Sequence, residues 1–373
     1  MKIGVIGYGL RIREVIRHIK LIEPAVRIAG IVDVRDFPEL KDEDGRAIPI
    51  FSAASDMLAA QKLDGIMIGT RCSEHTDYAL VVLPYGIPLY MEKPVSTSME
   101  KWKELYKAAA IYNNTPVVVS HPLRLTSIVQ KVKAIVAAGD IGDIAHVQAA
   151  NNVPYGGVYY HAWYRDDSIT GGMFLQKATH DFDYLTDIIG CRPERVCAVA
   201  SKQVFKGNKP AGLKCKDCED NRTCEESTVG TTEEENWPYC CFAEDTGNED
   251  SGSALVEYEN GVHLSYTQNF IVRRGAGTRG ARVVGYKGTI DFDFITGIIK
   301  VIHHHKDQED IYRFGAGDGH FGGDANLAAN FIGVMKGKEN SISTLQEGLR
   351  SALLCLKAKE SAQTKNYQEI VEL

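Results

Sequence analysis

Residues 3–33 restrict the first part of this chain to very few folds. An apolar run at 3–7 leads into the turn Gly7-Tyr8-Gly9, and a second apolar run at 28–32 ends at Asp33. Between them, apolar residues recur at the spacing of one helix face: Ile12, Val15, Ile16, Ile19 and Ile22. Strand, glycine turn, helix, strand and acid in this order are typical of a unit that binds a dinucleotide.

The turn and the acid predict which dinucleotide such a unit binds. Gly7 and Gly9 let the backbone approach a pyrophosphate, and the helix start at Leu10 and Arg11 adds N–H groups and partial positive charge. Asp33 is placed to accept hydrogen bonds from ribose hydroxyls and to repel a 2′-phosphate. The pattern therefore predicts NAD as the cofactor, with NADP less favoured.

Two residues near this turn depart from the usual pattern. Ile12 stands where the third glycine of the fingerprint is expected, so the helix must pack differently against the strand. Arg35 follows Asp33 closely enough to weaken the preference for NAD. The alternative interpretation is a strand–helix–strand unit whose glycine turn binds no nucleotide.

Three further apolar runs extend the predicted sheet. They cover 64–69, 87–91 and 116–120, and the polar residues Thr70, Lys93 and His121 follow them. Ligands of open α/β sheets bind beyond the carboxyl ends of the strands. The sequence therefore predicts a doubly wound parallel Rossmann sheet in a domain of residues 1–122, with these polar residues at its ligand-binding edge.

Length and charge limit the remaining classes. A chain of 373 residues exceeds the usual size of one core, so a second domain is expected over 123–373. The net charge of −7 disfavours nucleic acid as a partner. No apolar run reaches the roughly 18–20 residues that span a bilayer, so no membrane contact is expected. The apolar start reads as a strand rather than a signal peptide, which predicts a cytoplasmic location.

Several motifs, in order along nearly the whole chain, resemble the Gfo/Idh/MocA family of oxidoreductases. They are Glu92-Lys93-Pro94, the loop from Thr70 to His75, Arg124, the turn Ala138–Gly142, and Gly171-Gly172 followed by His180 and Asp183. Arg71 and Cys72 depart from the family's loop. The resemblance implies that Thr70, His75, Glu92 and Lys93 lie at the cofactor.

The resemblance also implies a catalytic pair, Lys93 and His180, that flanks a reacting hydroxyl group. Histidine titrates near neutrality and can accept the hydroxyl proton, while lysine can stabilise developing alkoxide charge. Asp183, one turn after His180, is expected to orient the imidazole or to bind substrate. The family's aspartate four residues before the histidine is Gln176 here, and Lys177 beside it is an alternative base if burial lowers its pKa.

The second domain is predicted to be an α+β domain with a large, mostly antiparallel sheet and a closing helix near 344–362. Its expected strands are 144–150, 193–205, 252–258, 261–269, 280–285, 288–292 and 297–302. In the resembling family one face of this sheet covers the cofactor. The other face commonly pairs with a second subunit, which predicts a homo-oligomer, a dimer or a tetramer.

Substrate contacts are expected from aromatic and polar residues of this domain. The segment 159–166 alternates aromatic and polar side chains, which suits the C–H faces and hydroxyls of a sugar ring, although a packing segment explains it equally well. The candidates are His161, Trp163, Tyr164, Arg165, Arg124 and His320. A helix-capping loop is an equally good explanation for His320. His303-His304-His305 is expected on an exposed strand, where alternating directions disfavour a metal site.

Residues 206–251 form a polar, acidic insert that holds five of the nine cysteines. Cys215, Cys218 and Cys224 fall within ten residues, and Cys240 or Cys241 is available as a fourth ligand. Such a set predicts a structural zinc site, with an iron–sulfur cluster or free thiols as alternatives. The insert resembles one found in a subgroup of the family.

Taken together, the sequence predicts an NAD-dependent dehydrogenase that acts on a secondary hydroxyl carbon of a sugar, polyol or glycoside. Two alternatives stay open. One is an NAD-dependent glycosidase, in which transient oxidation acidifies a neighbouring C–H bond and permits elimination. The other is a nucleotide-responsive regulatory protein without catalysis, against which the presence of both Lys93 and His180 argues.

Overall fold

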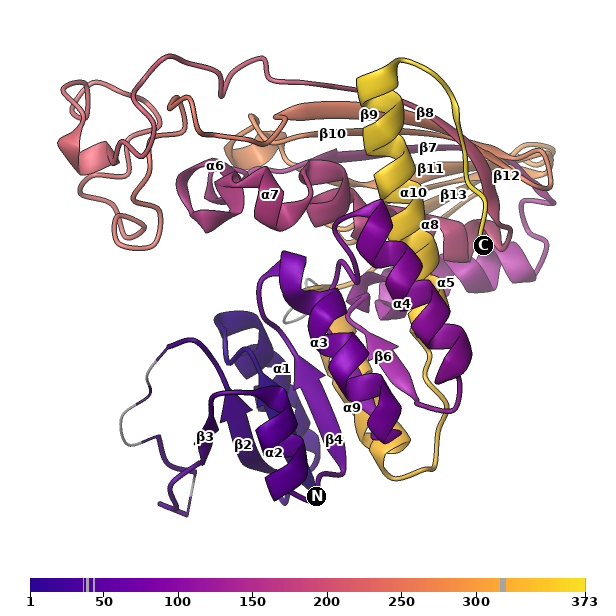
Figure 1. Cartoon of the computed structure of the whole chain (residues 1–373). Coiled ribbons are helices and arrows are strands. Elements are labelled where there is room, and N and C mark those ends of the chain that lie inside the picture. Colours follow the sequence, from indigo (N-terminus) through magenta and orange to yellow (C-terminus); the bar gives the residue numbers. More distant parts are fainter. Residues whose placement is uncertain (36, 38–39, 43, 316–319, 373) are drawn as a thin grey trace. The chain divides into compact units, whose positions relative to one another are not determined.

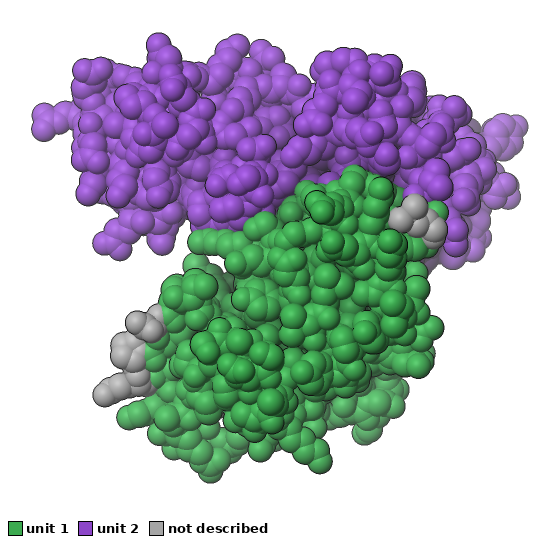
Figure 2. Space-filling view, in the orientation of Figure 1, with its two compact units in different colours: residues 1–129, 317–353, 372–373 green, residues 130–316, 354–371 purple. Residues whose placement is uncertain are grey.

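The structure is a computed structural model that describes residues 1–35, 37, 40–42, 44–315 and 320–372. It divides into two compact units, coloured separately in Figure 2, and each is described here by itself. Unit 1 comprises residues 1–129, 317–353 and 372–373, and unit 2 comprises residues 130–316 and 354–371. Within the described ranges, no helix is both long and apolar enough to cross a membrane.

Unit 1 is built on a parallel sheet (Figure 1). Its strands, in spatial order, are β3 (Ile50–Phe51), β2 (Arg27–Val32), β1 (Lys2–Ile6), β4 (Gly65–Ile68), β5 (Leu89–Met91) and β6 (Val117–Val119). This order reverses between β1 and β4, as in the doubly wound dinucleotide-binding fold. The predicted Rossmann sheet is confirmed, and β3 is an addition to the predicted strands.

Helices connect and cover these strands. They are α1 (Leu10–Ile22), α2 (Ala54–Ala60), α3 (His75–Val82), α4 (Met99–Ile111) and α9 (Gly323–Met335), while α5 (Ser127–Ala137) and α10 (Leu345–Thr364) each continue from one unit into the other. α1 buries the apolar face that its periodicity predicts, with Ile12, Val15, Ile16 and Ile19 inside.

Ile12 replaces the third glycine of the fingerprint, and Gly69 leaves the space that the Ile12 side chain needs. A Cβ atom on Gly69, just after β4, would lie 1.9 Å from Cγ1 of Ile12. The close approach of helix to strand is therefore permitted by a glycine on the neighbouring strand instead of one on the helix. Gly69→Ala in this chain is a severe overlap, because the Ile12 side chain fills the space.

The division of the chain differs from the predicted boundary at residue 122. Residues 317–353 return to unit 1, because α9 packs its apolar face onto the Rossmann core. Leu327, Ala328 and Phe331 are buried in one cluster with Ile12 and Val15. The segment after the second sheet thus completes the first unit, which a single boundary could not describe.

Unit 2 contains a mostly antiparallel sheet of nine described strands. In spatial order they are β14 (Glu309–Arg313), β13 (Ile298–His303), β12 (Gly288–Asp293), β11 (Thr278–Gly285), β7 (Ile144–Asn152), β10 (His263–Asn269), β9 (Ser251–Tyr258), β8 (Pro193–Ser201) and β15 (Gln368–Glu369). Only the β7–β10 pair among them is parallel. The predicted α+β fold is confirmed, with β14 and β15 as additions.

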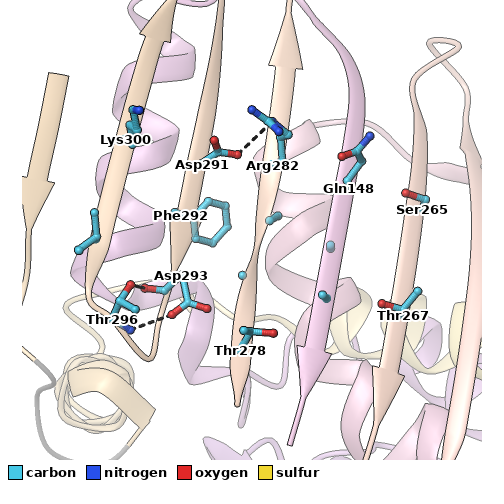
Figure 3. A pocket seen from close by; sticks show the side chains of 15 residues that line it. Gln148, Ser265, Thr267, Thr278, Arg282, Asp291, Phe292, Asp293, Thr296 and Lys300 are labelled. Carbon is cyan, nitrogen blue, oxygen red and sulfur yellow. Dashed lines mark hydrogen bonds and ion pairs between the residues drawn. The ribbon is translucent and has the colours of Figure 1, made fainter. Parts of the chain in front are cut away.

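The two faces of this sheet differ. The inner face buries alternate residues such as Val147, Leu264 and Ile290, and α8 (Thr179–Ile189) packs here through the contact of Tyr184 with Phe292. The opposite face carries polar side chains, and Figure 3 shows several of them around a shallow hollow of 690 Å³.

The prediction for the three consecutive histidines needs correction. His303 ends β13, but His304 and His305 lie in the turn that follows, so the expected histidine strand is wrong for these two residues. The turn forms because the chain reverses here to start β14.

The insert 206–251 is a loop-rich extension of unit 2 beside α6 (Val158–His161) and α7 (Asp167–Thr170) (Figure 1).

Candidate functional site

The glycine turn of unit 1 has the shape that a bound phosphate needs. Gly7 has a φ of +82°, and a Cβ atom there would lie 2.6 Å from the backbone nitrogen of Thr70. Gly9 is the N-cap of α1 and has no side chain over the first helical turn, which starts at Leu10. The turn therefore presents backbone and the positive end of a helix, and it fits the pyrophosphate of a dinucleotide.

Asp33 lies at the end of β2, as predicted, and is held by its neighbours. Its carboxylate accepts hydrogen bonds from the backbone of Tyr8 at 2.7 Å and from the side chain of Arg35 at 2.8 and 2.9 Å. Burial works to raise the pKa of Asp33, but the bonds from Arg35 and Tyr8 outweigh it and lower the pKa. An ionised carboxylate is thus fixed where the ribose of a dinucleotide binds in this fold.

Arg11, predicted to contact the cofactor, is engaged in two ion pairs within unit 1. Its guanidinium forms a fork with Asp324 of α9, with one bond of 2.7 Å, and its Nε lies 3.3 Å from Glu92. His320, predicted to contact substrate, lies 3.1 Å from the same Asp324 carboxylate. Arg11 thus ties the first turn of α1 to α9 and to the Glu-Lys-Pro loop.

The loop at 70–75 and the Glu-Lys-Pro segment are joined through His75. This buried ring lies 2.8 Å from the carbonyl oxygen of Pro94 through Nδ1 and 3.3 Å from that of Thr70 through Nε2. Burial lowers the pKa of His75 to about 4, against the opposing effect of the two carbonyls. His75 therefore acts as a neutral positioning residue that links the loop at 70–75 to Pro94, the residue after Lys93.

The depressed pKa of His75 predicts an acid-sensitive unit 1. The folded state disfavours the proton that the unfolded chain takes up near pH 6.5, so this stabilisation is complete above pH 6.5 and is lost as pH falls through about 4. The loss amounts to about 3 kcal/mol. His75→Gln should lose that much less stability than the parent between pH 7 and pH 4 in urea unfolding, with exposed His305→Gln as the control. Equal losses in parent and variant would contradict this account.

Lys93 and Arg124, predicted from the family motifs, have different surroundings. Lys93 is half-buried and close enough to Cys72 and His75 to influence the pKa of both. Arg124 is buried and forms an ion pair with Glu347 at the start of α10. The contact with Glu347 gives Arg124 a role in holding the C-terminal return of the chain, and its predicted substrate contact stays a prediction.

In unit 2, the predicted catalytic residues lie on a distorted helix. A π-helical turn, η5 (Phe174–Ala178), runs directly into α8, so Lys177 and His180 fall on either side of the junction. Both side chains are buried, as is that of Asp183. π-Helical turns occur frequently at functional sites, and this one directly precedes the helix that carries His180.

Lys177 has a partner that the sequence did not predict. Its ammonium group donates a hydrogen bond of 2.5 Å to the hydroxyl of Tyr155. Burial, together with Arg279, lowers the pKa of Lys177, and the ammonium charge of Lys177 lowers the pKa of Tyr155. A lysine and a phenol with lowered pKa values are a chemically competent proton-transfer pair beside α8.

The start of α8 is anchored to the sheet by a buried charge network around Asp181. Its carboxylate accepts hydrogen bonds from Arg279 Nε at 2.8 Å, Asn151 Nδ2 at 2.6 Å and the Tyr266 hydroxyl at 2.9 Å. All four side chains are buried. Asp181 thus fixes the helix position next to His180 from three strands of the sheet.

The predicted substrate segment 159–166 makes most of its described contacts to the insert. Arg165 pairs with Asp245 and donates to Thr246 at 2.9 Å. His161 is buried, with Nδ1 2.6 Å from the carbonyl oxygen of Tyr239. Trp163 and Tyr164 are half-buried and stack on each other at 3.8 Å. Of these four candidates, the stacked pair best fits a sugar-binding surface.

Backbone pairing brings two of the four predicted metal ligands, Cys215 and Cys240, side by side. Lys214 pairs with Tyr239, and Cys240 donates its N–H to Leu213 at 2.8 Å, which places Cys215 beside Cys240. Burial raises the pKa of Cys240, and the charges of Cys215, Cys218 and Cys224 raise it further. The zinc site of these four cysteines stays a prediction.

Two family models match this chain. Residues 1–121 match the oxidoreductase family with an NAD-binding Rossmann fold, and residues 129–291 match the GFO/IDH/MocA C-terminal domain. The chain belongs to the Gfo/Idh/MocA family. The resemblance inferred from the motifs of both units is therefore confirmed.

Individual relatives in the Gfo/Idh/MocA family are distant. YteT of Bacillus subtilis (strain 168), an oxidoreductase by name, is 24% identical over 265 residues, which are 62% of this chain and 60% of YteT. The inositol 2-dehydrogenase of Agrobacterium fabrum is 23% identical over 183 residues, 48% of this chain and 50% of that protein. The chain thus spans half to three fifths of the length of these curated relatives.

A solved structure shares the whole fold of this chain. A levoglucosan dehydrogenase in complex with NADH and levoglucosan is 17% identical to this chain and superposes with a TM-score of 0.77, covering 100% of both chains. At this identity the likeness shows the fold alone.

Proposed function

We propose that this Gfo/Idh/MocA protein is an NAD-dependent dehydrogenase that oxidises a secondary hydroxyl carbon of a sugar, polyol or glycoside. The observation that carries the proposal is the pair of buried, basic side chains, His180 and Lys177, at the junction of η5 and α8. A regulatory binder needs no such bases. The NAD-binding family match of residues 1–121 supports the cofactor.

Each unit has a part in this reaction. NAD, when bound, supplies the hydride acceptor at C4 of its nicotinamide. Lys93 binds the reacting oxygen and stabilises negative charge on it, and His180 accepts the hydroxyl proton. The Lys177–Tyr155 pair is the alternative acceptor of that proton, supported by the lowered pKa of both groups. Asp183 orients His180 or binds substrate.

A carbohydrate-like substrate is supported by the relatives and by one surface. Two of the similar proteins are an inositol 2-dehydrogenase, named for a cyclic polyol, and a levoglucosan dehydrogenase in complex with levoglucosan, an anhydrosugar. The stacked rings of Trp163 and Tyr164 suit the C–H face of such a ring.

The proposal is tested by NADH absorbance with purified protein, NAD and a panel of inositols, aldoses, anhydrosugars and aryl glycosides. Turnover on a cyclic polyol or sugar supports the dehydrogenase. Release of aglycone without NADH accumulation supports oxidation followed by elimination instead. NAD binding without either product across the panel contradicts the proposed activity.

Asp33→Ser is expected to reverse the cofactor preference. The substitution removes the acceptor of the ribose hydroxyls and releases Arg35 to meet a 2′-phosphate. Charge-assisted bonds are worth about 1.5–3 kcal/mol, so NAD affinity should fall roughly ten- to hundred-fold. Binding of NADH and NADPH by fluorescence titration checks the shift, and Asp64→Ser, outside the turn, is the control. Unchanged selectivity would place the ribose elsewhere.

We also propose that Cys215, Cys218, Cys224 and Cys240 bind a structural zinc ion.

We further propose that the protein forms a homo-oligomer through the outer face of the large sheet. Small and polar side chains such as Ala150, Ser265 and Thr267 line the hollow on this face and leave room for a second sheet (Figure 3). Light scattering after size exclusion checks the assembly, and a monomer at micromolar concentration would contradict it.

A further inference from the structure

The insert brings a second set of metal-ligating side chains together, apart from the four predicted cysteines. The ligand atoms of His161, Glu226 and Cys241 all lie within 4.8 Å of one another. Nε2 of His161 is 3.8 Å from Oε2 of Glu226. Bond lengths of about 2.0–2.3 Å to tetrahedral zinc separate neighbouring ligand atoms by about 3.4–3.8 Å, so a small contraction closes this set on an ion.

The histidine is oriented as a metal ligand requires. Its Nδ1 lies 2.6 Å from the carbonyl oxygen of Tyr239, which accepts only an N–H. That contact fixes a proton on Nδ1, so Nε2, which faces Glu226, is the nitrogen that an ion would bind in exchange for a proton. The ring of Trp237 lies nearly parallel to the imidazole, at 11°, with the two ring centroids 6.5 Å apart.

The carboxylate of Glu226 is also held in place by hydrogen bonds. Arg273 donates two hydrogen bonds to Glu226, at 2.7 and 2.8 Å, one to each oxygen. A second shell of this kind, a carbonyl on the histidine and a cation on the carboxylate, is what orients ligands in metal sites. His161 and Cys241 are 2% and 1% exposed, so an ion bound here is held away from bulk water.

We propose that His161, Glu226 and Cys241 form a second metal site, which takes a divalent ion of zinc-like preference with imidazole, carboxylate and thiolate ligands. Three protein ligands leave the fourth tetrahedral position for water or a small anion. Cys215 is not a ligand of this second site. Its sulfur lies 3.8 Å from Nδ1 of His161, the ring nitrogen that faces Tyr239, whereas Nε2 faces Glu226. We therefore keep Cys215 in the four-cysteine set.

Such a site has a clear structural consequence within unit 2. His161 ends α6, whereas Glu226 and Cys241 come from separate loops of the insert. The insert has little regular secondary structure to hold these loops. An ion at this point therefore fastens the insert to the segment that carries Trp163 and Tyr164, so metal loading should reduce proteolysis of the insert.

The test is the metal content of the full-length protein after loading with zinc or cobalt, measured by mass spectrometry and by cobalt absorption. The parent should bind two ions per chain. Cys241→Ser and Glu226→Gln should each bind one and keep the intense thiolate-to-cobalt band of the four-cysteine site. Cys218→Ser should lose that band and keep one ion. Glu225→Gln and Cys197→Ser are the matched controls and should bind two.

The outcomes separate this site from the four-cysteine site. One ion that Cys241→Ser removes and Cys218→Ser keeps supports the second site and contradicts the first. One ion that Cys241→Ser and Glu226→Gln both keep overturns the second site, as does a parent that binds none. Circular dichroism and NAD binding show that each variant is folded, so a lost ion reports a lost ligand.

Discussion

Lys93→Met is expected to lower kcat for NADH formation by roughly 100- to 1000-fold, because the variant loses the positive charge that stabilises the developing alkoxide. Methionine keeps much of the side-chain volume, and Lys93 is only half-buried, so the fold should persist. Stopped-flow and steady-state measurements of NADH formation check the loss, and fluorescence titration checks that NAD still binds. Lys103→Met, on the exposed side of α4, is the matched control and should retain full activity.

His180→Ala extends the same test to unit 2. Loss of a general base costs roughly 100- to 10,000-fold in rate. If His180 is the base, the variant should lose the acidic limb of the pH–rate profile, and Lys177→Met should keep it. The opposite result assigns the proton to the Lys177–Tyr155 pair. Activity within a few-fold of the parent in both Lys93→Met and His180→Ala would contradict the proposed dehydrogenase mechanism.

Asp181→Ala is expected to destabilise unit 2 by about 3–5 kcal/mol, because it leaves the Arg279 guanidinium buried without its counter-charge. For a domain of this size the melting temperature should fall by roughly 6–20 °C. Differential scanning calorimetry measures the change. The double variant Asp181→Leu with Arg279→Met should recover part of the loss, since two apolar residues replace the uncompensated charge.

The control for this prediction lies on the surface of α10, in the part that belongs to unit 2. Lys357 and Glu360 form an ion pair one helical turn apart, and 40% of the Glu360 side chain is accessible. Water and salt screen such a pair, so Glu360→Ala should cost at most about 1 kcal/mol. Equal losses for Asp181→Ala and Glu360→Ala would show that the buried network does not anchor α8.

The elements that sequence predicted best are those with strong periodicity. The central strands of both sheets are nearly continuous or strictly alternating apolar runs, because each buries at least one face. β14 was not predicted from the sequence, because it lies at the edge of the sheet and buries neither face fully. Its residues alternate between exposed and half-exposed, and most of them are charged or polar. β3 and β15 have two residues each and carry no period at all.

Functional residues in local sequence motifs could be predicted, whereas those that meet only in the folded chain could not. Lys93, His180 and Asp33 sit in local motifs, so spacing along the chain was enough to single them out. Arg279 and Asp181 are 98 positions apart and meet only through the fold. Tyr155 gave a weak signal at most, as one tyrosine before two glycines. His161 was assigned to substrate from its aromatic neighbours, whereas its contacts join it to cysteines more than 50 positions away.

The return of α9 to the Rossmann core sets an order of events on the ribosome. The apolar cluster around Ile12, Val15 and Ile16 is complete only when Leu327 and Phe331 have been translated. At about 5–20 residues per second, the first unit waits about 10–45 s for its last segment. A nascent chain of this protein therefore carries an unfinished Rossmann core while strands β7 to β14 of the second sheet are being made, although the first strands of unit 1 are translated before all of them.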